Sequence, residues 1–175
     1  MGQEKVVSTK KIFEGKALTL RVDTIDKPSG ERVTREIIEH NDCIAAVVLD
    51  DKDNVVLVRQ YRRAAGKSLL EIPAGSVEKG EKLEECVRRE LQEEIGYLPG
   101  KIKKLGGFYA APGYCTEYMN IFLCSDLKES RLVAEDTDEI EVVRVPLTRI
   151  PAMIEKGEIC DAKSVGGLLM VLPKL

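Results

Sequence analysis

The chain has 175 residues, of which 43% are apolar and 33% are charged, and its formal net charge is −3. This composition suits a folded protein with one main hydrophobic core and a small appendage. The mild acidity and the lack of a basic block argue against a nucleic-acid partner, and no apolar run is long enough to span a membrane.

Residues 10–40 predict a small antiparallel sheet, and the polar residues 1–9 before it are expected to be frayed. Strands are expected at residues 11–14, 18–25 and 33–39. Three strands this short bury little apolar surface on their own. We therefore expect residues 1–40 to form an appendage that packs on the main domain or on a second subunit, and we predict a homodimer.

From residue 41 onward, strand and helix patterns are mixed. Strands are expected at residues 43–49, 54–61, 69–72, 102–110, 117–123 and 139–145. Helices are expected at residues 83–95, 147–155 and 162–172. Strands combined with helices on two sides indicate an α/β sandwich, so we assign residues 41–175 to one main α/β domain.

The predicted helix at residues 83–95 carries two carboxylates on its apolar face. It contains no Pro or internal Gly, and Gly96 follows it as a natural stop. At about 100° per residue, Glu90 and Glu94 lie within ~20° of Leu83, in the middle of the apolar face. Glu is rarely buried without a partner, and like charges one turn apart repel each other. A divalent cation would relieve both costs, whereas a solvated face, the ordinary explanation of a Glu-rich helix, fits poorly.

Neighbouring residues extend this predicted cation site. Glu93 lies at the edge of the same face, four residues after Arg89, and an Arg89–Glu93 pair would orient the cluster. Gly75 lets the backbone approach a ligand closely, which makes the carbonyl of Ala74 a candidate ligand. Oxygen ligands of this kind suit Mg²⁺, with Mn²⁺ as an alternative, and such ions assist phosphate chemistry. The predicted metal ligands are Ala74, Glu90, Glu93 and Glu94, supported by Arg89 and Gly75.

Nine residues at fixed spacing complete the pattern G-x5-E-x7-R-E-U-x-E-E-x-G-U, in which U is a bulky apolar residue. They are Gly75, Glu81, Arg89, Glu90, Leu91, Glu93, Glu94, Gly96 and Tyr97. In this the chain resembles the Nudix hydrolases, which use magnesium or similar ions to cleave a diphosphate linked to another group X. The resemblance implies a Nudix-like α/β/α sandwich with a mixed sheet as the catalytic domain, with a catalytic part for Glu93.

Segments outside this pattern resemble the ADP-ribose pyrophosphatase branch of the family. They are residues 35–40, 55–62, 70–75 and 161–164, together with Pro112, which lies sixteen residues beyond Gly96. The resemblance implies hydrolysis of ADP-ribose to AMP and ribose 5-phosphate, with a small nucleoside diphosphate sugar as the binding partner.

Several residues are candidates for substrate contact. Arg62 suits a bidentate contact with phosphate, with an ordinary surface arginine as the alternative. The resemblance implies that Glu71 contacts ribose and that Glu36 contacts the substrate from the N-terminal sheet. Where many relatives place an aromatic residue that stacks on adenine, this chain has Ala17 and Arg35. Arg35 is a candidate for stacking instead.

The acidic stretch at residues 135–139 has two interpretations. It is either a solvated loop or, as the resemblance implies, the source of a metal ligand or of the general base. Alignment on the following apolar strand favours Asp138 or Asp136, with Glu139 and Glu135 in reserve. Many relatives carry Glu here, and aspartate is shorter, so the choice of base stays open.

Three rival functions follow from the same residues. One is a pyrophosphatase for another nucleoside diphosphate sugar, such as GDP-mannose, which the residues singled out above would not separate cleanly from ADP-ribose. Another is a nucleotide sensor without turnover, which the intact pattern disfavours. The third is a hydrolase of damaged nucleoside triphosphates, which the N-terminal sheet and Pro112 disfavour.

The remaining reactive residue types predict little chemistry. The single histidine, His40, cannot form the metal or nucleophile sets that need several histidines, and we expect it to be structural. Five scattered cysteines without a CxxC pattern favour free thiols and a reducing, cytoplasmic compartment over a disulfide framework.

Overall fold

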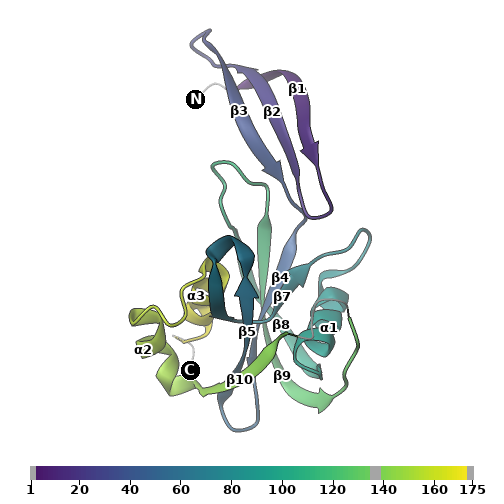
Figure 1. The fold of residues 1–175 in the computed structure, drawn as a ribbon, viewed down its shortest axis with the longest axis vertical. Helices are drawn as coiled ribbons and strands as arrows, with labels where there is room; N and C mark the ends of the chain where they lie inside the picture. The colour runs from purple at the N-terminus through teal and green to yellow at the C-terminus, as the bar shows by residue number, and fades with distance from the viewer. Residues whose placement is uncertain (1–2, 135–138, 173–175) are drawn as a thin grey trace. The chain divides into compact units, whose positions relative to one another are not determined.

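The computed structural model describes residues 3–134 and 139–172, and the contacts of the chain divide it into two units (Figure 1). The smaller unit comprises Met1–Asp42 and Tyr109–Tyr118, and the larger comprises Cys43–Phe108 and Met119–Leu175. The sequence placed residues 109–118 with the main domain, whereas the contacts place them in the smaller unit. The functional roles assigned to residues 1–40 and 41–175 stay predictions.

The smaller unit contains the expected three-stranded antiparallel sheet, in the order β1-β2-β3. Its strands are β1 (Lys5–Glu14), β2 (Thr19–Asp26) and β3 (Arg32–Glu39). The expectation of a frayed start was wrong for residues 5–9, because this polar segment is held by its ladder to β2, in which Lys5 pairs with Asp26. The end of β3 is hydrogen-bonded to the second segment of the unit. Ile38 N donates to Tyr114 O at 2.7 Å, and Ile38 O accepts from Thr116 N at 2.9 Å.

The larger unit is built on a seven-stranded sheet in the order β10-β5-β4-β9-β8, with β6 paired to β5 and β7 paired to β4. Its strands are β4 (Cys43–Leu49), β5 (Asn54–Arg62), β6 (Lys67–Glu71), β7 (Ala74–Ser76), β8 (Tyr97–Tyr109), β9 (Tyr118–Glu129) and β10 (Glu141–Pro146). Because β4 is parallel to β9 but antiparallel to β5 and β7, the sheet is mixed, as predicted.

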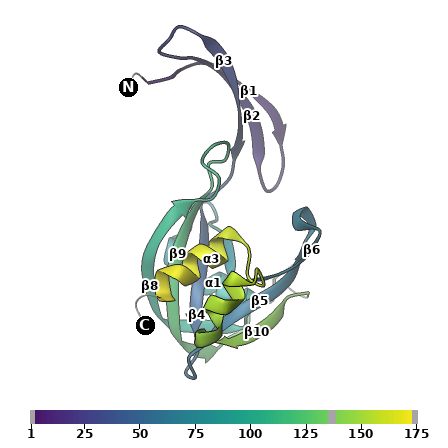
Figure 2. The ribbon, with the colours of Figure 1, turned by 90° about the vertical axis from the view of Figure 1, so that its left-hand side faces the viewer.

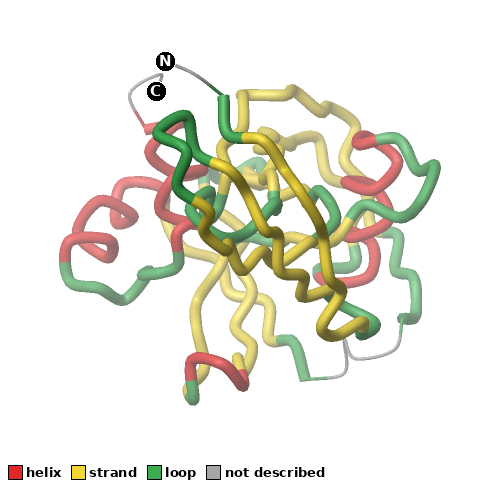
Figure 3. The backbone as a smooth tube through the Cα atoms, turned by 90° about the horizontal axis from the view of Figure 1, so that it is seen from above, coloured by secondary structure: helices red, strands yellow, loops and turns green. Residues whose placement is uncertain are grey.

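Helices cover both faces of this sheet, and this confirms the predicted sandwich. They are α1 (Leu83–Glu94), α2 (Ile150–Glu155) and α3 (Ala162–Val171). Alternate residues of β4 enter two separate cores: Ala45 packs in the cluster that contains Leu168 of α3, and Ile44 packs in the cluster that contains Leu91 of α1. Figure 1 shows α1 on one side and α2 with α3 on the other, and Figure 3 shows helices flanking the strands. Within the described ranges, no helix is long and apolar enough to cross a membrane.

Helix α3 lies very close to the sheet, across whose face it runs in Figure 2. Gly167 permits this approach, because a Cβ at that position would lie 2.9 Å from Ile72 Cδ1. The close packing brings Ser164 Oγ to the backbone N–H of Ile72, from which it accepts a hydrogen bond of 2.9 Å. The N-terminal turn of α3 is therefore fixed to the segment that follows β6.

Candidate functional site

The site begins where β6 ends and the chain turns through Pro73 into β7. The strand expected from the sequence ends at residue 72, before a Pro-Ala-Gly stretch typical of a turn, whereas the structure forms the short strand β7, which pairs with β4 through Ala45↔Ala74 and Ile44↔Gly75. The turn is also anchored to β4, because Ala46 N donates to Pro73 O at 2.9 Å. Pairing with a distant strand overrides the local turn signal, and it gives the backbone around Ala74 a fixed position beside α1.

Gly75 is in direct contact with the carboxylate of Glu90. A Cβ built on Gly75 would overlap the carboxylate carbon and both carboxylate oxygens. A larger residue here would force the end of the Glu90 side chain to move, so glycine leaves the space that this carboxylate occupies. Burial raises the pKa of Glu90 above its ordinary value, and the neighbouring Arg89 opposes that rise.

Glu94 is the most deeply buried carboxylate of α1, with 8% of the residue exposed. Its Oε2 accepts a hydrogen bond of 3.1 Å from the backbone N–H of Ala74. Burial, followed by repulsion from Glu90, raises the pKa of Glu94 to about 8. Two acidic groups are thus held out of water on one helix face, which is the arrangement that a divalent cation stabilises.

Arg89 connects the other carboxylates of the site. The expected pair with Glu93 is present, with Nη1 3.3 Å from Oε2, and the same nitrogen lies 2.6 Å from Glu90 Oε1. The sequence did not predict the stronger contact, in which Nε and Nη2 donate to the two oxygens of Glu81 at 2.9 and 3.0 Å. This bidentate contact lowers the pKa of Glu81 to about 2. Arg89 also donates to the carbonyl of Ser76 at 3.2 Å, and so ties α1 to β7.

The carboxylates of α1 are oriented by Arg89 rather than gathered around one point. Within the described ranges, no three acidic side chains of α1 bring ligand atoms within 4.8 Å of one another. Closing a metal shell therefore requires Glu90 or Glu93 to turn away from the Arg89 guanidinium. These residues suit a hard divalent cation, because they offer carboxylate oxygens shielded from water, and the backbone of β7 passes directly beside them.

Beside this cluster, Glu71 at the end of β6 is almost completely buried, with 2% exposure. Both of its oxygens accept from Arg62, at 3.1 and 3.0 Å from Nε and at 2.6 Å from Nη2. A second cation, Lys163 Nζ, lies 3.0 Å from Glu71 Oε2. The sequence indicated Arg62 and Glu71 as substrate contacts, whereas Lys163 lay within the segment 161–164 that resembles the branch but was given no role of its own.

The remaining predicted residues lie elsewhere in the chain. Arg35 and Glu36 are exposed residues of β3 in the smaller unit, where Arg35 Nη2 lies 3.3 Å from Glu4 Oε1. Glu139 is exposed in the turn before β10. Asp136 and Asp138, the favoured candidates for the base, fall outside the described residues.

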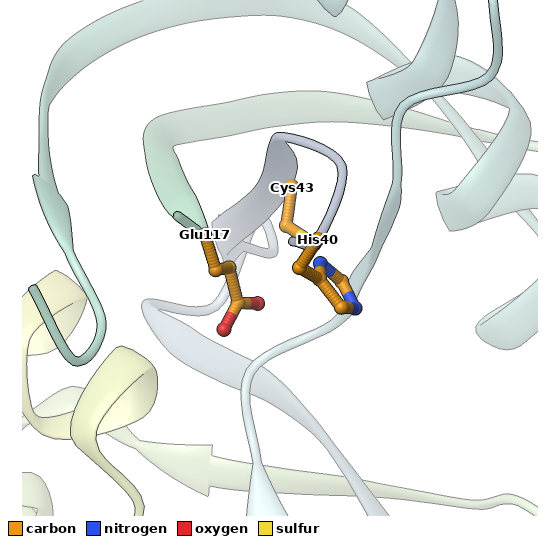
Figure 4. A group of neighbouring side chains, drawn as sticks. All are labelled: His40, Cys43 and Glu117. Atoms are coloured by element: carbon orange, nitrogen blue, oxygen red, sulfur yellow. The ribbon is translucent and has the colours of Figure 1, made fainter. Parts of the chain in front are cut away.

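The single histidine has structural contacts within the smaller unit. His40 N donates to Thr116 Oγ1 at 2.9 Å, and that hydroxyl donates back to His40 O at 3.1 Å. Figure 4 shows the side chains of His40 and of Glu117, the residue after Thr116. These contacts join β3 to the second segment of the unit, which agrees with a structural part for His40.

Comparison with known proteins agrees with this geometry. The NUDIX domain model matches residues 39–165. An ADP-ribose pyrophosphatase of Bacillus subtilis (strain 168) is 36% identical over 165 residues, which are 93% of this chain and 89% of that protein. A GDP-mannose pyrophosphatase of Citrobacter koseri is 34% identical over 180 residues, covering 94% of this chain and 93% of that one.

A solved structure described as an ADP compounds hydrolase superposes with a TM-score of 0.92, at 24% identity, over 100% of this chain and 95% of its own. At that identity the likeness supports the fold alone, and it agrees with the sandwich described above. The matched domain covers most of the chain, and the complete fixed-spacing pattern lies inside it. This chain belongs to the Nudix family.

Proposed function

We propose that the protein hydrolyses the diphosphate bond of ADP-ribose, giving AMP and ribose 5-phosphate, in a reaction that depends on a divalent cation. The observation that carries the proposal is the burial of Glu90 and Glu94 against Gly75 and Ala74, inside an intact Nudix pattern. The choice of ADP-ribose is supported by the relative from Bacillus subtilis, which is named an ADP-ribose pyrophosphatase and aligns with 93% of this chain.

The cation would be held by Glu90, Glu93, Glu94 and the carbonyl of Ala74. Mg²⁺ suits these hard oxygen ligands, and Mn²⁺ is the alternative. A cation held there would supply positive charge against the diphosphate and would activate water for attack on phosphorus. The raised pKa values of Glu90 and Glu94 support the assignment, because a bound cation would favour the ionised form that burial disfavours.

The protein's own contribution is to orient these carboxylates. Arg89 holds Glu81 by two hydrogen bonds and contacts both Glu90 and Glu93. Its positive charge therefore holds these three carboxylates in fixed positions next to one another. Glu93 is the proposed catalytic carboxylate on α1. The proton of the attacking water passes to an ionised carboxylate that acts as general base. Asp138, Asp136 and Glu139 are the candidates.

Substrate binding is assigned to residues beside the carboxylates. Arg62 grips the diphosphate or the terminal ribose, since 40% of its side chain is exposed while Glu71 fixes its geometry. A direct ribose contact for Glu71 stays a prediction. From the smaller unit, Glu36 and Arg35 are proposed to contact the nucleotide, with Arg35 in place of an adenine-stacking aromatic residue.

A second candidate substrate is another nucleoside diphosphate sugar, of which GDP-mannose is an example. The relative from Citrobacter koseri, named a GDP-mannose pyrophosphatase, aligns with 94% of this chain. Arg62 and Glu71 would bind the part common to both substrates, so they do not discriminate between them.

We further propose a cytoplasmic homodimer. Three apolar side chains of β1, Val6, Ile12 and Phe13, are 55%, 50% and 57% exposed in the single chain. A three-stranded sheet with such residues in water gains stability when a second surface covers it. The five free thiols are consistent with a reducing compartment.

The experiment is a substrate panel with Mg²⁺, comparing kcat/KM for ADP-ribose, GDP-mannose, NADH, diadenosine polyphosphates and nucleoside triphosphates. The highest value for ADP-ribose supports the proposal. A higher value for GDP-mannose would keep the Nudix chemistry and move the substrate to the second candidate. Tight binding of one panel member without any turnover would instead indicate a sensor.

A further inference from the structure

Four charged side chains form an ion-pair chain between the end of β5 and the start of α3. Arg62 donates to both oxygens of Glu71, and Lys163 Nζ lies 3.0 Å from Glu71 Oε2. The same Nζ lies 2.8 Å from Asp161 Oδ1. The charges alternate in sign along the chain, so each inner group has an opposite charge on both sides.

Exposure along this ion-pair chain is uneven. The side chains of Glu71, Lys163 and Asp161 are 2%, 14% and 15% exposed, whereas that of Arg62 is 40% exposed. Arg62 also uses only Nε and Nη2 on Glu71. Among residues 3–134 and 139–172, which the structure describes, Arg62 Nη1 has no hydrogen-bond or ion-pair partner. A ligand can therefore reach the ion-pair chain at Arg62.

The inner end of the ion-pair chain is fixed to the fold. Asp161 caps α3 by accepting Ser164 N at 3.1 Å. Ser164 in turn accepts the backbone N–H of Ile72, which directly follows Glu71. Lys163 lies in the first turn of the same helix and is held between Asp161 and Glu71. Its position is thus set by backbone contacts on both sides.

Two cations on one buried carboxylate have a specific consequence for binding. If Arg62 alone neutralised Glu71, an anionic ligand at Arg62 would compete with Glu71 for the only positive charge. Lys163 supplies a second cation, so the charge of Glu71 stays balanced and its oxygens keep their contacts with Nε and Nη2 when Nη1 is engaged. The guanidinium then needs no reorganisation on binding, which lowers the cost of association.

We propose that Lys163 is a positioning residue for substrate binding: acting through Glu71, it holds Arg62 so that Nη1 is free for the anionic diphosphate of the substrate. This inference rests on the proposed function, because it takes a nucleoside diphosphate sugar as the ligand of Arg62. Lys163 itself does not touch the substrate, since its Nζ is engaged by Glu71 and Asp161 and only 14% of its side chain is exposed.

The first test is Lys163→Met, which removes the charge and keeps most of the side-chain length. We expect KM to rise at least ~10-fold with kcat changed less than ~3-fold, the pattern of a lost contact that is equal in ground and transition states. Lys156→Met is the matched control, because Lys156 is exposed after α2, and it should leave both constants unchanged. An unchanged KM in Lys163→Met would overturn the proposal.

The second test separates positioning from direct contact and from a purely structural part. Arg62→Met is compared with the double variant Arg62→Met/Lys163→Met. If Lys163 acts only through Arg62, adding Lys163→Met raises KM less than ~2-fold further, because the two changes are coupled. Effects that multiply would show that Lys163 acts independently of Arg62, and would overturn the proposal.

A third variant guards against misfolding of Lys163→Met, in which Glu71 loses one of its two cations. Lys163→Met/Glu71→Gln removes that buried charge, so its melting temperature should return toward that of the wild type. Its KM should stay raised, because Arg62 has lost its ionic anchor. Recovery of both the melting temperature and KM would show that Lys163 matters only for folding.

The outcome is kept separate from that of the proposed function. The kinetic comparison uses whichever panel member the wild type turns over fastest, since the diphosphate is common to the nucleoside diphosphate sugars. Should none be turned over, the proposed function fails, and the same variants are compared by calorimetric Kd for ADP-ribose in EDTA. There, equal Kd values for wild type and Lys163→Met would overturn the positioning role alone.

Discussion

The carboxylate of Glu90 occupies the space that a side chain on Gly75 would need. Gly75 does not adopt a positive φ, so the reason for glycine is the close approach of β7 to α1. The contact joins the start of the fixed-spacing pattern to α1, and it places the Glu90 carboxylate directly against β7.

We predict that Gly75→Ala lowers kcat by ~10²-fold, because the new methyl group must displace Glu90 or pull β7 from β4. The measurement is steady-state ADP-ribose hydrolysis together with the melting temperature. Gly113→Ala is the matched control, since a Cβ there meets nothing within 4 Å. Wild-type turnover in Gly75→Ala would contradict the assigned position of Glu90.

Glu94→Gln and Glu90→Gln should each reduce turnover by at least ~10²-fold while the protein stays folded, because each removes a charge of the proposed cation site with little change in side-chain volume. Circular dichroism checks the fold, and calorimetry with Mg²⁺ checks the loss of cation affinity. Glu84→Gln, on an exposed position of α1, is the control. Full activity in either site variant would refute the metal assignment.

The stability of the metal-free protein should fall as pH rises from about 4.5 to about 8. Burial raises the pKa of Glu94 from 4.5 to about 8, so in this window the folded state holds a proton that the unfolded state has released. Urea unfolding in EDTA at several pH values, compared between wild type and Glu94→Gln, measures the effect.

In Glu94→Gln the pH slope should be flatter, because the shifted group is gone. Saturating Mg²⁺ should oppose the fall in the wild type, since the cation binds the ionised carboxylates of the folded state. If the two proteins have the same slope between pH 4.5 and 8, the burial of Glu94 does not control its protonation.

Arg89→Lys should lower both stability and turnover, because one ammonium group cannot reproduce the bidentate contact with Glu81 together with the contacts to Glu90 and Ser76. We expect a loss of about 2 kcal/mol in the free energy of unfolding. Arg88→Lys, one residue earlier on a more exposed position, should cost less than about 0.5 kcal/mol. Equal losses in the two variants would argue that Arg89 has no special part.

Light scattering should give twice the mass of the 19.5 kDa chain. The physical reason is the exposed apolar surface of β1, which a second subunit would cover. Ile12→Lys/Phe13→Lys should shift the protein toward the monomer, whereas Lys10→Glu should leave the mass unchanged. A monomeric mass for the wild type would refute the proposed homodimer.

The sequence predicted the core of the fold because its signals there are local and periodic. The expected helix at residues 83–95 appears as α1, and the 3.6-residue period that put Glu94 on the apolar face agrees with its burial beside Cys86, Val87 and Leu91. The mixed sheet and the helices on both faces followed from the same patterns. The metal-binding role of the carboxylates stays a prediction that the variants above test.

Contacts between distant segments could not be predicted in this way. Strand β7 exists because Ala74 and Gly75 pair with β4, and nothing in the local sequence outweighs the turn signal of Pro73. Lys163 reaches Glu71 only because α3 packs on the sheet, as in the contact of Ser164 with Ile72, which are 92 residues apart. Periodicity describes one element at a time, so it cannot pair residues across the core.

Cation-dependent hydrolysis of ADP-ribose is best examined by measuring the products of turnover with Mg²⁺ and with EDTA. We expect equal amounts of AMP and ribose 5-phosphate with Mg²⁺ and neither product in EDTA. Undiminished turnover in EDTA, or no release of AMP from ADP-ribose at saturating Mg²⁺, would contradict it.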